Sequence, residues 1–233
     1  MGIKITIVGA TGKMGKALIE LLHTDKEAAL SHTCCSSVKP PHSPLDIGIK
    51  ECSVAIDFST PQILTDMLTI ALRENKALVI GTTGFSDEQR LSIEKAAEQI
   101  PILLAPNFSR GIYLMSKALP ALLGAKEAQI RLIETHHKEK KDAPSGTAKD
   151  LTKQIFNLSK KDIPIESIRS EQSFGTHSLT IELDGEIITL CHEAKSRTPF
   201  AQGALDAAKW LASKKAGLYT LANFLEDHET GRT

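Results

Sequence analysis

The chain has few aromatic side chains and no excess of charge of either sign. Only 4% of its 233 residues are aromatic, with a single Trp, which argues against a surface that stacks on bases or sugars. The 28 Lys and Arg residues balance 28 Asp and Glu residues, so no overall positive field attracts nucleic acid. No apolar run reaches the roughly 20 residues of a membrane-spanning helix. We therefore expect neither a nucleic-acid nor a membrane partner.

Cysteine is also scarce. Four cysteines are too few for a disulfide scaffold of this length, and Cys34 and Cys35 are adjacent rather than spaced like a zinc or redox pair. The first residues lack the pattern of a signal peptide. These features predict free thiols and a cytoplasmic protein. The apolar share of 41% and the charged share of 24% are those of an ordinary globular chain, long enough for one large domain or two small ones.

The first half of the chain alternates short β-branched runs with amphipathic helical patterns. We expect strands at 3–8, 28–35, 54–58, 77–80 and 102–105, with helices at 14–22, 59–75 and from 86 onward. Strands separated by single helices indicate a Rossmann-like, doubly wound parallel sheet of the α/β class. Ligands on such sheets bind at the carboxyl ends of the strands.

The second half changes to residues that alternate with period two. We expect strands at 129–134, 178–183 and 187–191, the last two joined by a turn at Asp184-Gly185, and helices at 112–123, 148–158 and 203–212. This pattern predicts a smaller α+β domain with a mixed or antiparallel sheet. We expect residues 1–109 and 198–233 to form a dinucleotide-binding domain, and residues 110–197 to bind substrate and mediate oligomerisation. The tail at 226–233 is expected to be frayed.

A glycine-rich turn follows the first strand and opens the first helix, from Gly9 to Gly15. Backbone N–H groups at a helix N-terminus bind anions, and glycines let a pyrophosphate approach the main chain. Because Lys13 is not followed by Ser or Thr, the segment is not a nucleotide-triphosphate P-loop. The turn therefore predicts a dinucleotide site, with an unliganded glycine turn as the plain alternative.

The segment after the second strand lacks the acid that usually binds the ribose 2′-hydroxyl of NAD. Ser36, Ser37 and Lys39, with Lys13, could instead hold a 2′-phosphate. We therefore favour NADPH, or the use of both cofactors, over NADH alone. The alternative is that the two serines are simple loop residues.

Titratable side chains are concentrated between Glu134 and Thr147, after a strand and before a helix. Two histidines are followed by three lysines at positions 138, 140 and 141, and the segment ends in Ser145-Gly146-Thr147. Cations and free N–H groups at a helix start form a cradle for a small dicarboxylate. A histidine with a near-neutral pKa can also supply a proton. A solvated basic loop is the plain alternative.

These segments together resemble the dihydrodipicolinate reductase (4-hydroxy-tetrahydrodipicolinate reductase) family. The matching segments are Gly9 to Gly15, Gly81 to Phe85, Asn107 to Ser109, His136 to Thr147, Phe174 to His177 and Ser196 to Ala204. The resemblance covers nearly the whole chain in order, and the segment from His136 to Thr147 is its most specific part. It implies NAD(P)H-dependent reduction of 4-hydroxy-tetrahydrodipicolinate in diaminopimelate and lysine biosynthesis.

The same resemblance implies roles for single residues. It makes His136 the catalytic acid/base and Lys140 the second catalytic cation, and it assigns the ring carboxylates to His137, Ser145, Gly146 and Thr147. It places the cofactor, NADPH or NADH, on Gly9, Ala10, Thr11, Gly12, Lys13, Met14, Gly81, Thr82, Thr83, Ala105, Pro106, Asn107 and Phe108. It implies a homotetramer built through the sheet of the second domain, and no metal. The missing acid and a short segment between Pro41 and Ile49 depart from the family pattern.

Four other interpretations remain open from the sequence. Tyr113 and Lys117 have the spacing of the short-chain dehydrogenase pair, although the glycine motif differs from that family's. His136, His137 and His192 could form a metal site, but we expect adjacent strand histidines to point apart, with no carboxylate beside them. A Schiff base on Lys140 leaves the glycine motif unexplained. A non-catalytic NAD(P)-binding sensor, or a reductase of another small dicarboxylate, is the main alternative.

Overall fold

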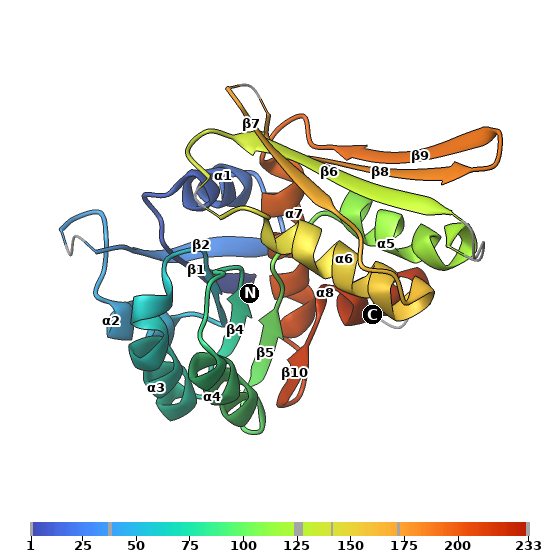
Figure 1. The fold of residues 1–233 in the computed structure, drawn as a ribbon. Coiled ribbons are helices and arrows are strands. Elements are labelled where there is room, and N and C mark those ends of the chain that lie inside the picture. The colour runs from blue at the N-terminus through green and yellow to red at the C-terminus, as the bar shows by residue number, and fades with distance from the viewer. Residues whose placement is uncertain (1, 37–38, 124–127, 141, 172, 232–233) are drawn as a thin grey trace. The chain divides into compact units, whose positions relative to one another are not determined.

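The computed structural model describes residues 2–36, 39–123, 128–140, 142–171 and 173–231 (Figure 1). The chain divides into two compact units. The first comprises Met1–Phe108 and Phe200–Thr233, and the second comprises Ser109–Pro199. No helix in the described ranges has the length and apolar content needed to span a bilayer.

The first unit contains a six-stranded sheet whose paired strands all run parallel, in the order β10-β5-β4-β3-β1-β2. Its strands are β1 Ile3–Val8, β2 Ala28–Cys34, β3 Val54–Asp57, β4 Ala77–Ile80, β5 Pro101–Leu104 and β10 Gly217–Tyr219. The strands β3 and β4 are buried along their whole length, as strands covered on both faces must be. The predicted Rossmann-like sheet is confirmed.

Helices of the first unit lie on the sheet and bury its faces. They are α1 Lys13–Leu22, α2 Leu45–Glu51, α3 Leu64–Glu74, α4 Asp87–Ala97, α7 Thr198–Leu211 and α8 Leu221–Glu229, with a short 3-10 turn η1 at Pro61–Ile63. Ile49 of α2, Met67 of α3 and Ile93 of α4 pack in one apolar cluster with strand residues. Helix α1 contacts β1 and β2, and Lys209 of α7 pairs with Asp25 in the turn between α1 and β2.

The second unit contains a four-stranded mixed sheet in the order β7-β6-β8-β9. Its elements are α5 Arg110–Leu122, β6 Gln129–His137, α6 Gly146–Ser159, β7 Ile165–Ser170, β8 Thr176–Leu183 and β9 Glu186–Glu193. The β6–β7 pair is parallel and joined through α6, whereas β6–β8 and β8–β9 are antiparallel. Helices α5 and α6 pack on one face of this sheet, where Leu132, Leu151 and Leu179 share an apolar core. The predicted α+β class is confirmed.

Several elements differ from the sequence-based expectations. The structure adds α2 within the segment that followed the expected second strand, and it adds β7 and β10. The expected frayed tail is wrong through Glu229, because α8 continues to that residue behind a capping box of Thr220 and Asn223. Residues 232 and 233 lie outside the described part.

Candidate functional site

The loops at the carboxyl ends of β1 to β5 in the first unit contact one another. The amides of Gly9 and Ala10 donate to the carbonyl of Cys34 at 3.0 and 3.1 Å, which ties the first loop to the end of β2. The amide of Ser59 donates to Thr82 Oγ1 at 2.9 Å, which ties the loop after β3 to the loop after β4. These hydrogen bonds join the first loop to the end of β2, and the loop after β3 to the loop after β4, at one edge of the sheet.

Glycine is required at specific points of this edge. Gly9 has φ +83°, and a Cβ there would lie 2.4 Å from the carbonyl oxygen of Phe58. A Cβ on Gly15 would lie 2.4 Å from the carbonyl oxygen of Gly9, and one on Gly81 would lie 2.2 Å from the Phe58 ring. Gly12 occupies the N-cap position before α1 and has no side chain to cap the helix. The turn therefore offers backbone amides and close approach, the features that a pyrophosphate needs.

A buried carboxylate stabilises the loop after β3. Asp57 is 1% exposed and accepts hydrogen bonds from the backbone amide and hydroxyl of Ser59. Burial raises the pKa of Asp57, although the hydrogen bonds from Ser59 and Thr82 act in the opposite direction. The carboxyl group thus holds both loops in place and is covered from solvent.

The predicted cofactor residues lie on these loops and in the first turn of α1. Gly9 to Gly12 connect β1 to α1, Lys13 and Met14 begin α1, Gly81 to Thr83 follow β4, and Ala105 to Phe108 follow β5. Lys13, Ser36 and Lys39 have exposed side chains, as a 2′-phosphate site requires. Ser37 lies outside the described residues.

In the second unit, His136 lies near the carboxyl end of β6 beside a buried carboxylate. Its Nδ1 is 2.7 Å from Oε2 of Glu134, which occupies the same face of the strand two residues earlier. Glu134 is 0% exposed and His136 is 8% exposed. The rings of His136 and His177 pack edge to face with their centroids 5.2 Å apart. The strand thus positions His136 inside the unit, and the alternation of the strand separates it from His137.

The first turn of α6 lies against the same carboxylate. The hydroxyl of Ser145 caps the helix by accepting a hydrogen bond from the amide of Ala148. The amide of Ser145 donates to Glu134 Oε1 at 3.2 Å, and its hydroxyl lies 3.3 Å from His177 Nε2. Gly146 and Thr147 form the start of the helix. The histidine at 136 and the predicted carboxylate-binding turn are therefore joined through Glu134.

Lys140 occupies the turn between β6 and α6. Its Nζ forms an ion pair with Asp142 Oδ1 at 2.8 Å. Lys138 instead pairs with Glu171, and both of those side chains are exposed. Lys141 lies outside the described residues. Of the two lysines of this group that the structure describes, Lys140 is the one whose charge acts on His136.

One polar cluster in the second unit is formed by Glu134, His136, Lys140, Asp142, Arg169 and His177. Burial and charge set the protonation of this cluster. Burial acts to raise the pKa of Glu134, but hydrogen bonds from Ser145 and the charge of His136 lower it to about 2. Burial lowers the pKa of His136, Glu134 raises it, and Lys140 and Arg169 lower it, with a net decrease. Burial and the charge of His136 lower the pKa of His177 to about 3. Near neutral pH, the cluster contains an ionised Glu134 and a neutral His177.

The cluster offers the donor set of a metal site. Ligand atoms of Glu134, His136 and His177 all lie within 4.8 Å of one another. The expectation that no carboxylate accompanies these histidines was therefore wrong. However, Arg169 donates from both terminal nitrogens to Glu134 Oε1 at 3.3 Å. A guanidinium bound to the carboxylate opposes a second cation there, so the charges favour an acid–histidine pair.

The cluster contains four residues for which the sequence predicted no role, namely Glu134, Asp142, Arg169 and His177. The pairing of β6 with β7 places Arg169 opposite His136, and the pairing of β6 with β8 places His177 opposite Glu134. A signal was available for Glu134, because residues two apart on a strand share a face. No sequence signal identified Arg169, since its strand was not predicted.

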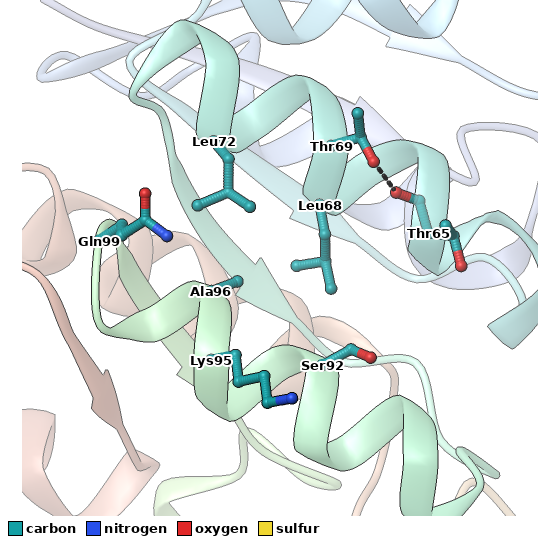
Figure 2. A pocket seen from close by; sticks show the side chains of 8 residues that line it. All are labelled: Thr65, Leu68, Thr69, Leu72, Ser92, Lys95, Ala96 and Gln99. Atoms are coloured by element: carbon teal, nitrogen blue, oxygen red, sulfur yellow. Dashed lines mark hydrogen bonds between the residues drawn. The ribbon is translucent and has the colours of Figure 1, made fainter.

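Two other features, the Tyr113–Lys117 pair and a groove between α3 and α4, are weaker candidates for a functional site. Tyr113 is buried on α5 with Lys117 Nζ 5.7 Å from its ring centroid, an arrangement of packing in the second unit. A groove of about 260 Å³ lies between α3 and α4. Figure 2 shows the side chains that line it. Among the eight residues that line it, Lys95 has the only charged side chain. Neither feature combines a proton donor with an anion site.

Comparison with known proteins gives consistent matches over nearly the full chain. Family models described as dihydrodipicolinate reductase, N-terminus and C-terminus, match residues 3–108 and 111–225. A protein named 4-hydroxy-tetrahydrodipicolinate reductase from Rickettsia bellii is 39% identical over 97% of this chain and 96% of its own. One of the same name from Helicobacter hepaticus is 38% identical over 96% of this chain and 99% of its own.

A solved structure agrees with these matches. The dipicolinate-bound dihydrodipicolinate reductase from Paenisporosarcina sp. TG-14 is 26% identical, with a TM-score of 0.76. The match covers 94% of this chain and 98% of that chain.

Proposed function

The chain belongs to the dihydrodipicolinate reductase family, and on that premise we propose how its residues carry out NAD(P)H-dependent reduction of 4-hydroxy-tetrahydrodipicolinate. The observation that carries the proposal is the linkage, through buried Glu134, between His136 and the capped N-terminus of α6. It joins a titratable proton donor to an anion-binding turn. The product, tetrahydrodipicolinate, is an intermediate of diaminopimelate and lysine synthesis.

The first unit binds the dinucleotide. Its glycine turn and the start of α1 take the pyrophosphate, because Gly9 and Gly15 leave the main chain open to close approach. The loops after β4 and β5 take the nicotinamide end, through Gly81 to Thr83 and Ala105 to Phe108. When bound, reduced NAD(P) supplies a hydride.

The second unit binds the substrate. The N-terminus of α6 takes one ring carboxylate through Gly146, Thr147 and the hydroxyl of Ser145, because the amide of Ser145 is already bound to Glu134. His137 and the ammonium group of Lys140 lie at the same end of β6 and add positive charge for the dicarboxylate. The dipicolinate in the Paenisporosarcina structure is a ligand with this pair of carboxylates.

His136 transfers the proton. Its imidazole is held at the carboxyl end of β6, buried, with Nδ1 against Glu134. Hydride addition and protonation by the imidazolium, together with loss of the 4-hydroxyl group as water, balance the conversion to tetrahydrodipicolinate, and Lys140 stabilises the negative charge that hydride addition creates. A general acid of this kind contributes about 10²- to 10⁴-fold in rate.

A coupled absorbance assay tests these assignments. Aspartate semialdehyde and pyruvate are passed through the condensing synthase, and loss of NADPH or NADH is followed after this protein is added. We expect oxidation that requires every component. His136→Gln should lower kcat about 10²-fold or more, with unchanged cofactor affinity. Lys140→Met should raise KM and lower kcat, whereas Lys138→Met, which removes the same charge from the same loop, should change neither. A fully active His136→Gln protein would contradict the assignment of His136 as the proton donor.

We also propose a homotetramer assembled through the uncovered face of the second sheet. Support comes from the alternation that places Ile168 and Ile187 on that face, where they are 40% and 66% exposed. Sedimentation should show a particle of four chains, and Ile187→Glu should dissociate it. Sedimentation of the unmodified protein as a monomer at working concentration would refute the proposal.

The cytoplasm is the proposed compartment. The four cysteines are free thiols, two of them buried, and a reducing compartment keeps thiols in this state. Cell fractionation of the tagged protein should recover it with cytoplasmic markers, and recovery in an oxidising compartment would contradict the proposal.

A further inference from the structure

Glu134 is the most deeply buried acid of the second unit's cluster, and its two oxygens have different partners. Oε1 accepts a hydrogen bond from the amide of Ser145 at 3.2 Å and hydrogen bonds from both terminal nitrogens of Arg169 at 3.3 Å. Oε2 lies 2.7 Å from Nδ1 of His136. The hydrogen bonds to Oε1 hold the carboxylate in one orientation, and in this orientation Oε2 lies next to Nδ1 of His136. Burying a carboxylate is unfavourable unless it is paired, so the arrangement calls for an explanation.

We propose that Glu134 is a positioning residue for the reaction, which keeps a proton on Nδ1 of His136 and leaves Nε2 to exchange the proton with the substrate. The inference rests on the proposed function, since it gives the histidine its direction of transfer. A buried carboxylate next to one ring nitrogen selects the tautomer and stabilises the imidazolium form. Glu134 therefore acts through His136 without touching substrate.

Arg169 completes the arrangement from the neighbouring strand. Its guanidinium binds Glu134 Oε1, and one of its nitrogens also donates to the carbonyl of Asp142 at 2.6 Å. The Arg169 side chain thus orients the carboxylate and also binds the main chain of the loop that carries Lys140. While Glu134 is ionised, its contact with Arg169 keeps the carboxylate from rotating away from His136.

The other ring nitrogen of His136 lies beside a glycine. A Cβ on Gly175 would lie 3.2 Å from Nε2 of His136. A side chain at position 175 would therefore crowd the nitrogen that we propose exchanges the proton. Within the described part of the chain, the charged groups that act on His136 are Glu134, Lys140 and Arg169, and the neutral ring of His177 lies against it. Of these, Glu134 alone favours the protonated form.

The test compares Glu134→Gln, Glu134→Asp and Asp162→Asn, a control that removes an exposed carboxylate from the same unit. Glu134→Gln should lower kcat about 10²-fold, in the range of general-acid catalysis, and leave cofactor affinity unchanged. Its loss of activity with rising pH should begin at lower pH than in the unmodified protein. Glu134→Asp keeps the charge and should restore the pH profile in part. Asp162→Asn should match the unmodified protein.

Nitrogen-15 NMR of the histidine rings gives a readout that does not depend on turnover. The signals of His136 are identified by their loss in His136→Gln. We expect the Nδ1-protonated tautomer in the unmodified protein and a mixture, with a lower pKa, in Glu134→Gln. An unchanged tautomer and pH profile in Glu134→Gln would overturn the inference, and thermal unfolding shows that each variant is folded.

The same series separates the two proposals. Full activity of His136→Gln refutes the catalytic assignment of His136, whatever Glu134→Gln does. An inactive His136→Gln together with an unaltered Glu134→Gln refutes the positioning role alone. If both assignments hold, the double variant should be no slower than His136→Gln, because the carboxylate acts through the imidazole.

Discussion

Lys140 Nζ lies 2.8 Å from Oδ1 of Asp142, so the lysine proposed to attract the substrate is already paired with an acid two residues later. The lysine side chain is 25% exposed and the aspartate side chain is 43% exposed. A partly exposed pair of this kind is worth at most about 1 kcal/mol. A dicarboxylate that binds Lys140 competes with this partner.

Asp142→Asn should therefore strengthen substrate binding. Removing a competitor worth at most about 1 kcal/mol should lower KM by roughly two- to fivefold, with kcat little changed. Steady-state kinetics at several salt concentrations measure the effect, which should shrink as salt screens the charges. Glu171→Gln is the matched control, since it removes the partner of Lys138 in the same region. A KM that rises in Asp142→Asn would contradict the competition.

Gly175→Ala should crowd Nε2 of His136. The added Cβ would lie 3.2 Å from Nε2, and the residue has φ +136°, so we expect a fall in kcat/KM of about 10²-fold. Gly185→Ala provides the control, because Gly185 also has positive φ, of +79°, but nothing lies within 4 Å of the added Cβ. Both variants should lose some stability through backbone strain. Equal activity losses in the two would attribute the effect to strain alone.

Ser36→Asp should shift the cofactor preference toward NADH. The new carboxylate follows β2, where an acid accepts the ribose 2′-hydroxyl and repels a 2′-phosphate. We expect the ratio of kcat/KM for NADPH to that for NADH to fall about tenfold or more, equivalent to about 1.4 kcal/mol. Ser92→Asp adds the same charge to exposed α4 and should leave the ratio unchanged. An unaltered ratio in Ser36→Asp would place the 2′-phosphate elsewhere.

Acid stability should depend on Glu134. Its pKa falls from an ordinary 4.5 to about 2 in the folded protein, so it stabilises the fold above pH 4.5. That contribution is lost as pH falls from 4.5 toward 2, and amounts to about 3 kcal/mol at most, at 1.36 kcal/mol per pKa unit. Denaturant unfolding between pH 6 and pH 3 should show a smaller loss in Glu134→Gln than in the unmodified protein. Parallel curves would contradict the assigned pKa.

The parallel sheet was predictable because its signals are local. β4 is apolar along its whole length and β3 is apolar up to Asp57, and glycine or hydroxyl residues follow within two positions of each strand end. The strand β7 was missed because Glu166, Ser167 and Arg169 leave only two apolar residues in the element. It forms because Ile165 joins the core against β6. Tertiary contacts thus override weak local preference.

The candidate site was predictable only as a segment. The run from His136 to Thr147 contains a histidine, a lysine and a capped helix start in sequence, so its chemistry was visible. The partners of Glu134 come from β7 and from the first turn of α6. Such contacts depend on strand register, which residue spacing within one segment does not specify. The charged groups around His136 therefore could be identified only from the structure and not from the sequence.

The first unit is discontinuous in sequence, and this has a consequence for synthesis of the protein. Its edge strand β10 pairs with β5, yet some 110 residues separate them, including all of the second unit. While the chain emerges from the ribosome, β5 has no neighbour on that side, and an uncovered strand edge can pair with other chains. We expect nascent chains that end before Gly217 to be the species most dependent on chaperones. Release of the last residues would then close the sheet and remove that requirement.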